Sequence, residues 1–480
     1  MKKHIILAAL CLGAVACQPY FEMVPPGSAP TVEREFNEEW YVSKKGSGVK
    51  NGSDWNNAMP FSDFLKMLSN STTFLDDAGI YIQEGTYLVT EQDKCITLKK
   101  NIKCIRGGYS ADLEYDDVSE CDPVAHPTIF TGDVNGDGLT GEGDGAFAYV
   151  TDGKIAFENI TFRNFYQGSV QEGALDGKGT AVFGINGPYL TTSVDCKNCI
   201  FENNVNGVAG TTSHEGGPCA LVNQGYFRAS GCVFRDNSGN SRGGVIRTNA
   251  EQSVVFLSRC LFTGNKLTGG SFGSAIQCSG GVICANNCTM VGNVGTGATL
   301  NGGGAFYLSN NTIIDNSAPD GTNNAAFRCE SKDNRKSRMI NNVFSNADAS
   351  GYGLLMNSGA TAISDGFNVF KSISLGGGSP TDPHVGTDLI KDVVLTGALD
   401  GNVWKWDLSQ IEADLKGYAN GDDVYNSAVK FDPSSYCGIS GMGRAFISWA
   451  TAIDLYVDGR GNQRGDDSFQ PGSYDPNLDE

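Results

Sequence analysis

The chain has 480 residues, a length that suits two to four domains or one long repeat array. It carries 54 acidic and 35 basic residues, and this formal net charge of −19 argues against nucleic acid or an anionic membrane surface as a partner. With 63 glycines, 40% apolar and 19% charged residues, it is too apolar for disorder and too rich in glycine for a helical bundle. The composition favours many short strands joined by tight turns.

The N-terminus has the features of an export signal. Residues 1–16 hold two lysines followed by an apolar stretch that is too short to span a membrane, so they are predicted to be a signal peptide. The motif Ala14-Val15-Ala16-Cys17 resembles a bacterial lipobox, with Ala14 where Leu is more usual, and this resemblance implies that Cys17 is lipidated. Ordinary cleavage nearby is the alternative. Residues 17–35 would form a Pro-rich tether that holds a folded body off the membrane.

Residues 133–144 form the sharpest local motif. Oxygen-bearing side chains stand at loop positions 1, 3, 5 and 12, glycine stands at position 6, and position 7 can offer a backbone carbonyl. This is the ligand order of an EF-type calcium loop, and it also resembles one half of a dockerin repeat, without a second copy. The predicted ligands are Asp133, Asn135, Asp137, Leu139 and Asp144. The alternatives are a stabilising calcium ion and a plain acidic surface turn.

Seven segments in the middle of the chain share one pattern, a few β-prone residues that end at Asn. They begin, 23 to 39 positions apart, at Ile160, Cys199, Cys232, Cys260, Cys288, Asn311 and Asn342. Asn tolerates the left-handed conformation, so we expect it to form the turn. A glycine-rich motif precedes several segments, at residues 243–246, 273–276 and 303–306. Short strands at this period, with no helical pattern between them, predict the coils of a β-solenoid.

The alternation of side chains along each strand predicts which residues of the repeat point inward and which point outward. Cys260 and Phe262 should point inward, and stacked coils about 4.8 Å apart would align them with their equivalents in dry internal columns. Thiols stacked in register fit disulfide geometry poorly, so we expect free buried thiols in this column. Cys196 and Cys199 have the CxxC spacing of a redox site, but they lie in a strand-like repeat and are expected to be structural. The outward stripe is expected to be either covered by a loop, the favoured interpretation, or a flat contact surface. Its members are Ile200, Val233, Leu261, Thr289, Thr312 and Val343.

The joint pattern of Phe-x-x-Asn (Phe201 with Asn204, Phe234 with Asn237) and Gly-Gly-Val/Ala-Ile/Phe resembles the repeats of chlamydial polymorphic outer-membrane proteins. More broadly, it resembles right-handed parallel β-helix, or pectate-lyase-like, repeat proteins. The resemblance implies an all-β, right-handed parallel β-helix with N- and C-terminal caps. It is specific for fold and not for activity, because this fold carries lyases, hydrolases, adhesins and passive stalks.

The solenoid organises the rest of the chain. We expect residues 36–156 to form the N-terminal cap and first coils, with a weakly helical stretch at 61–75 over the open end. The clearest coils should lie within 157–375. Residues 376–480 are expected to hold the last coils and a C-terminal cap, because an uncapped coil exposes a β-edge. Two helices are predicted in this last region, at 408–415 and 443–455.

The basic residues of the coils are the candidates for catalysis. A β-helix lyase needs a base and a cation for the substrate carboxylate. The candidates are Arg242, Arg247, Arg328, Lys332 and Arg335, and none of them lies in a motif typical of pectate lyases. They are better explained as solvated surface cations. The histidines after the signal, His126, His214 and His384, are scattered and indicate neither a metal cluster nor a triad.

Two functions remain open on the sequence. The first is a non-catalytic cell-envelope lipoprotein, anchored in the membrane, with the outer membrane favoured, which acts in adhesion or binds a glycan or a surface protein. The second is a polysaccharide lyase or glycoside hydrolase that acts on a uronic-acid-containing glycan. The acidic charge argues mildly against anionic polymers, and the first function is favoured.

Overall fold

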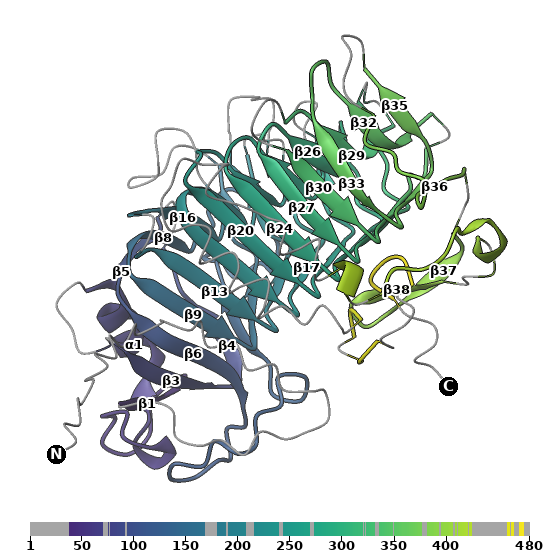
Figure 1. Ribbon diagram of the computed structural model, residues 1–480. Coiled ribbons are helices and arrows are strands. Elements are labelled where there is room, and N and C mark those ends of the chain that lie inside the picture. The colour runs from purple at the N-terminus through teal and green to yellow at the C-terminus, as the bar shows by residue number, and fades with distance from the viewer. Residues whose placement is uncertain are drawn as a thin grey trace, which may run out of the picture.

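The structure, a computed structural model, describes most of residues 38–424 and 458–474 (Figure 1). The residues outside the description are 1–37, 71–74, 76, 92–93, 169–179, 189–190, 208–215, 240–242, 269–272, 320, 322, 332–335, 349, 377–381, 393–394, 407–408, 410, 421, 425–457, 461, 465–469 and 475–480. The predicted signal, tether and lipidation residue Cys17 therefore lie outside the described residues, as does the predicted helix at 443–455.

The described chain winds through three long parallel sheets, named A, B and C here. A coil enters through sheet C, continues into sheet A and turns into sheet B, and four coils add a short strand in sheet D. Each strand pairs in parallel with its equivalent in the next coil, so the coils stack side by side along one axis (Figure 1). The predicted all-β, right-handed parallel β-helix is confirmed.

The strands of sheet A are β1 (Glu39–Ser43), β2 (Met59–Pro60), β3 (Ala78–Gln83), β6 (Ile102–Tyr109), β9 (Lys154–Glu158), β13 (Ser193–Lys197), β16 (Ala220–Ser230), β20 (Ser253–Ser258), β24 (Val282–Asn286), β27 (Ala305–Ser309), β30 (Ser337–Ile340) and β33 (Ala362–Gly366). Those of sheet C are β5 (Ile96–Lys99), β8 (Ala148–Asp152), β12 (Phe183–Asn186), the first part of β16, β19 (Ile246–Thr248), β23 (Ile276–Cys278), β26 (Leu300–Gly302), β29 (Ala325–Cys329), β32 (Tyr352–Met356) and β35 (Ile373–Leu375).

Sheet B is formed by β4 (Gly85–Leu88), β7 (Thr128–Thr131), β10 (Ile160–Arg163), β14 (Ile200–Glu202), β17 (Val233–Arg235), β21 (Leu261–Thr263), β25 (Thr289–Val291), β28 (Thr312–Ile314), β31 (Val343–Phe344), β34 (Val369–Phe370) and β36 (Leu389–Ile390). The strands of sheet D are β11 (Tyr166–Gln167), β15 (Val205–Asn206), β18 (Ser238–Gly239) and β22 (Lys266–Leu267). A separate antiparallel hairpin consists of β37 (Gly397–Asp400) and β38 (Val403–Trp406).

The N-terminal end is closed by the helix α1 (Phe61–Ser69), as the sequence predicts. Its buried side chains Phe61, Phe64 and Leu68 face the first coils, and the Phe61 ring lies 4.4 Å from that of Tyr87. The described chain also contains the short 3₁₀ turns η1 (Trp55–Asn57) and η3 (Glu412–Asp414). The helix predicted over 408–415 is thus reduced to η3 in the described part of that stretch.

The interior of the solenoid contains the predicted aromatic column. Phe162, Phe201, Phe234 and Phe262 come from successive strands of sheet B, and all four are fully buried. Neighbouring rings are nearly parallel, with centroids 5.0, 4.7 and 4.5 Å apart. Stacking of identical side chains in register therefore fills the core, and it fixes the register of the coils.

Most motif asparagines do not form the predicted turns but stack in the interior. After five of the sheet B strands, the left-handed residue is the one before the motif Asn, at Asn203, Asp236, Gly264, Gly292 and Asp315. In the first repeat it is the motif residue itself, Asn164, and the motif residue of the last repeat, Asn346, is not left-handed. The motif residues Asn204, Asn237, Asn265, Asn293 and Asn316 are buried instead. Each of the first four donates from Nδ2 to Oδ1 of its equivalent in the next coil, over 2.8 to 2.9 Å, and Asn316 ends the stack by donating to the backbone oxygens of Met290 and Ile314. The Asn is repeated because its amide can both donate and accept along a stack.

A second polar column occupies the corner between sheets A and B. Its first members are the predicted cysteines, and from the coil of Asn311 onward asparagine replaces cysteine. Asn311 donates to Asn342, and Asn342 donates to Asn368, each over 2.9 Å between Nδ2 and Oδ1. The buried carboxylate of Asp388 accepts from the backbone N–H of Asn368 at 3.0 Å and ends the column.

One glycine motif was aligned wrongly from the sequence. Residues 243–246 and 273–276 both lead into sheet C, where Ile246 pairs with Ile276. The next partner in that row is Leu300, whereas residues 303–306 run into β27 of sheet A. The coil that contains β26 and β27 is short, so two glycine-rich turns lie close together in its sequence. The turn before β27 was aligned with the motif in place of the turn before β26.

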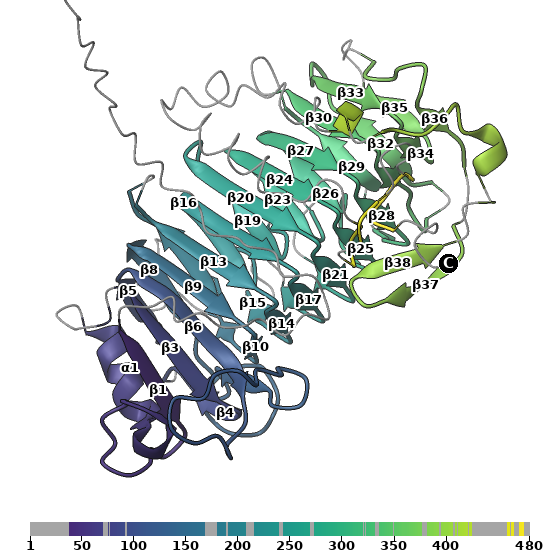
Figure 2. The same cartoon turned by 60° about the horizontal axis from the view of Figure 1, so that its bottom comes forward.

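The outer face of sheet B is covered from Leu261 onward by the chain's own C-terminal segment, which agrees with the favoured prediction for this part of the stripe. The covering side chains include Leu395, Val403, Trp406, Ile411 and Tyr474, which pack on the sheet from Leu261 to Val369. Figure 2 shows β38 alongside β21 and β25. The described part of the chain beyond the last coil thus lies along the side of the β-helix.

Residues 458–474, which we call the C-terminal clip, fasten this segment to the coils. The hydroxyl of Ser473 lies 2.7 Å from that of Thr289 and donates to that of Thr312 at 3.0 Å. The buried guanidinium of Arg464 donates to the backbone oxygens of Gln470 and Gly472 and so holds the clip in shape.

Candidate functional sites

The outward row of sheet B is divided into a covered and an open half. From Leu261 onward it lies under the C-terminal segment, but its earlier members are not part of that apolar cluster, apart from an edge contact of Val233. We call the earlier part the open strip; it consists of Thr86, Ile129, Thr161, Ile200 and Val233. Thr86 is exposed and the other four are half-buried or, at Thr161, 9% exposed. Figure 2 shows the strands of the strip, from β4 to β17, running up to β21 and the hairpin.

Three charged side chains stand beside the open strip in the next outward row of sheet B. Glu202 is buried, and it pairs with Arg163 of the preceding coil and Arg235 of the following coil. Both arginines direct Nε and Nη2 to the carboxylate, and their side chains remain 39% and 43% exposed. The triad ties three coils together and gives this part of the surface one net positive charge.

The predicted calcium loop lies beyond this charged row, at the ends of the sheet B strands. Its Thr140 hydroxyl donates to the backbone oxygen of Asn203 over 2.7 Å, which places the loop against the coil of β14. Within the loop, the Asp133 carboxylate accepts from the N–H groups of Gly136 and Gly138, and the Asp144 carboxylate from those of Val134 and Gly141.

The five predicted calcium ligands differ in burial. Asp144 is 1% exposed, whereas Asn135, Asp137 and Leu139 are exposed and Asp133 is half-buried. Burial, helped by the charges of Asp133 and Asp137, raises the pKa of Asp144 despite its two N–H donors. Among the described residues, no group of three or more His, Cys, Asp or Glu side chains is arranged to hold a metal ion. The calcium site stays a prediction.

Two of the five candidate basic residues lie in the described part, and they share one outward row of sheet C. Arg247 pairs in register with Gln277, which pairs with Asn301, which pairs with Arg328. Two polar contacts stabilise this row. Asn301 donates to Gln277 at 2.8 Å, and Arg328 forms a 2.7 Å ion pair with Glu330. The other candidates, Arg242, Lys332 and Arg335, lie outside the described residues.

Cross-coil ion pairs recur on the other outward faces. On sheet A, Arg106 pairs with Glu158 at 2.6 Å, Arg228 pairs with Asp195 at 3.3 Å, and Arg338 pairs with Asp365. Sequence reasoning missed all of them because the partners come from different coils and stand at unrelated positions of the motif. These ion pairs could be predicted only if the register between neighbouring strands were known.

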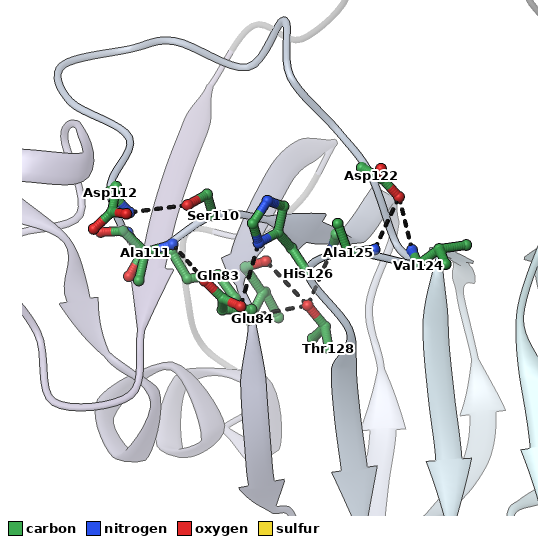
Figure 3. A network of polar contacts seen from close by, with 12 residues as sticks. Gln83, Glu84, Ser110, Ala111, Asp112, Asp122, Val124, Ala125, His126 and Thr128 are labelled. Atoms are coloured by element: carbon green, nitrogen blue, oxygen red, sulfur yellow. Dashed lines mark hydrogen bonds and ion pairs between the residues drawn. The ribbon is translucent and has the colours of Figure 1, made fainter.

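His126 has an acidic partner, although its position in the sequence indicated no role. Its Nδ1 lies 3.3 Å from the Glu84 carboxylate, which also accepts the N–H of Ala111 at 3.0 Å (Figure 3). Both contacts hold the pKa of Glu84 below its usual range, and the hydrogen bond from Ala111 has the larger effect. They attach both ends of the 110–127 loop to the coil, a structural role. His384 is exposed, and His214 lies outside the described residues.

All twelve cysteines of the described part are free, as predicted for the coils. Cys196 and Cys199 span the corner between β13 and β14 and are both fully buried. The described residues contain no helix long and apolar enough to cross a membrane.

Comparison with known proteins adds little to this picture. No protein-family model matches the chain, and no curated protein matches it. Among solved structures, it is similar to the pectate lyase Pel9A at 12% sequence identity, with a TM-score of 0.37, over 92% of this chain and 90% of that one. The fold therefore stands on the strand pairing described above.

Proposed function

We propose that the protein is a non-catalytic lipoprotein of the bacterial cell envelope, anchored to the outer membrane through Cys17, and that its β-helix acts in adhesion by binding a surface glycan or protein. The open strip is the proposed contact surface. The observation that carries this proposal is the division of one outward row: among the described residues, the apolar cluster of the C-terminal segment covers the row from Leu261 onward, contacts Val233 at its edge and does not include Ile129 and Ile200. Half-exposed β-branched side chains on a rigid sheet offer a flat, preorganised contact area.

The ion pairs explain the arginines that project from sheets A and B without a catalytic role. Arg106, Arg163, Arg228, Arg235 and Arg338 each face a carboxylate of a neighbouring coil. A guanidinium in such a pair is held in its charged form, so it is a poor base for proton abstraction. These side chains are accounted for by stacking of the coils.

The test combines binding with degradation. The purified protein is mixed with uronic-acid and neutral polysaccharides and with bacterial and host surface proteins, and capture is measured together with unsaturated products and new reducing ends. Capture without any product is expected. The double variant Ile200→Glu/Val233→Glu should then weaken capture by about tenfold or more, since charges would be buried at the contact.

The matched control is Val49→Glu, at a 74% exposed apolar residue near the N-terminal end. It should leave capture unchanged. Equal loss in both variants, or no loss in the strip variant, would remove the open strip as the contact surface. Unsaturated product from a uronic-acid polymer would replace the binding role with the lyase alternative, and reducing ends alone would point to a hydrolase.

A further inference from the structure

The cysteines of the corner column form a continuous row of thiols. Cys199, Cys232, Cys260 and Cys288 stand one coil apart in register, and Cys196 adjoins the first of them from β13. All five are fully buried. The Sγ atoms of Cys199, Cys232, Cys260 and Cys288 all lie 3.3 to 3.5 Å from backbone oxygens of the same corner, so the four side chains are oriented alike. No other described cysteines make such a row.

The spacing of this thiol column fits a soft cation between neighbours. Parallel strands set equivalent residues about 4.8 Å apart, and two metal–sulfur bonds of about 2.3 Å laid end to end span about 4.6 Å. Thiolates select soft ions such as Cu(I). A one-dimensional column gives each ion two ligands, one above and one below, which is why no cluster of three ligands is needed.

We propose that the thiol column binds monovalent soft cations, of the Cu(I) and Ag(I) class, in two-coordinate sites between neighbouring cysteines. Five cysteines leave four gaps. If four ions fill them while four thiols release their protons to solvent, four positive charges balance four thiolates, so the buried column stays neutral. Neutrality matters because an unbalanced charge in a dry core is very costly.

Loss of the thiol protons depends on the bound cations, because burial disfavours a thiolate that no positive charge balances. Because the column is buried, ions enter while the coils form, and binding is coupled to folding.

The asparagine part of the same column supplies the variants. Cys232 and Cys260 direct Sγ to the backbone oxygens of Cys196 and Ala229, 3.4 Å away. Asn311 directs Nδ2 to the equivalent oxygen of Ala285 at 2.9 Å. Asparagine therefore fits the position and makes the same contact, so Cys→Asn removes the thiol and keeps the stack.

The experiment uses the full chain, reduced and refolded with and without Ag(I), a soft ion that undergoes no redox change here. Bound silver is counted by native mass spectrometry, its coordination is read by X-ray absorption, and the thermal midpoint is measured. The expected result is four two-coordinate ions in the column and a raised midpoint. Cys232→Asn/Cys260→Asn should lose three of them, because only the gap between Cys196 and Cys199 survives.

Cys219→Ala is the matched control, since Cys219 is fully buried with burial as the sole influence on its thiol. It should keep all four column ions. Should the double variant fail to fold, Cys288→Asn, which extends the asparagine stack by one coil, is expected to lose one ion. Equal silver counts in the column variants and the Cys219 control, or a lowered thermal midpoint of the native sequence with Ag(I), would overturn the proposal.

Discussion

Asp388 accepts the backbone N–H of Asn368 at 3.0 Å and thereby ends a hydrogen-bonded column that runs through the corner of several coils. The same carboxylate accepts the hydroxyl of Ser364 at 2.9 Å and the N–H of Val385 at 3.0 Å. A carboxylate is suited to this place because it only accepts, and every group that faces it is a donor.

The first prediction concerns this terminus. Asp388→Ala leaves buried donors without an acceptor, so the free energy of unfolding should fall by about 3 kcal/mol. Asp388→Asn should lower the free energy of unfolding by less, about 1 kcal/mol. Its remaining oxygen can still accept from Asn368 and Ser364, and only the N–H of Val385 would face the amide NH₂ instead of an acceptor. Urea unfolding measures both, and Asp400→Ala, at an exposed aspartate of β37, is the control that should change nothing. A neutral Asp388→Ala would contradict a buried column end.

The second prediction concerns the C-terminal clip. Arg464→Ala removes a buried guanidinium that donates to Gln470 and Gly472, so residues 458–474 should detach from the coils. Limited proteolysis should then cut the C-terminal segment at least about tenfold faster, while the β-helix itself stays protected. Lys416→Ala, at an exposed lysine, serves as the control. Unchanged cleavage would show that the apolar contacts of Trp406 and Tyr474 suffice.

The third prediction concerns calcium at residues 133–144. The raised pKa of Asp144 means that its ionised form costs stability, a cost that grows as pH rises through that pKa and that a bound cation would relieve. Calcium should therefore raise the thermal midpoint at pH 7 more than at pH 4. Calcium at about 100 times its dissociation constant would add about 2.7 kcal/mol.

The double variant Asp133→Asn/Asp137→Asn tests the calcium site directly. It should abolish the calcium effect and lower the calcium-free midpoint only slightly, since each asparagine oxygen can still accept one of the loop's N–H groups and only the exposed N–H of Gly138 loses its acceptor. A calcium-independent midpoint of the native sequence would favour the surface-turn alternative.

The fourth prediction concerns pH and the 110–127 loop. The pKa of Glu84 is lowered in the folded state, so its contribution to stability is present above the ordinary glutamate range and is lost as pH falls through the lowered pKa. Amide exchange in this loop, at Ala111 above all, should therefore accelerate below about pH 4. In Glu84→Gln that acid-dependent step should disappear. A step of the same size in the variant would assign it to another carboxylate.

The fifth prediction concerns the anchor. Cys17→Ala should release the protein from the membrane fraction of cells and abolish incorporation of labelled palmitate, because no thiol would remain at the lipobox. Lys2→Ala, within the signal segment, is the control that keeps the acceptor thiol. A Cys17→Ala protein that stays in the membrane fraction would rule out lipid anchoring at this residue.

The sequence was most informative where identical side chains repeat. The inward positions of Cys260 and Phe262 follow from alternation and stacking, and the structure has them in register with their equivalents. The stacking role of the motif Asn was not predicted, because an asparagine repeated in every coil is equally consistent with a turn residue and with a stacked amide. The clip was missed for another reason: Ser473 and Thr289 are 184 residues apart, and no periodic pattern connects them.

The candidate sites were less predictable than the fold. Arg247 and Arg328 were singled out as basic residues of the coil region, yet only the register shows that they share a row with Gln277 and Asn301 between them. Of the open strip, the predicted outward stripe contained only Ile200 and Val233. In the described part of the chain, the contacts of the C-terminal segment extend to the coil of Val233, where Asn402 donates to the backbone oxygen of Gly231 at 3.3 Å, and a sequence pattern does not show where such contacts end.

The position of the clip has a consequence for how the protein is made. The coils of the β-helix can close one after another as the chain emerges, because each contacts its neighbours. Thr289 and Thr312 obtain their partner only when the chain has emerged as far as Ser473. Before the segment from Leu395 to Tyr474 has emerged, the row from Leu261 to Val369 is bare, so a product that stops before this segment would expose an apolar surface to proteases and to other chains. The cover of sheet B is therefore complete only after all of the described coils have been synthesised.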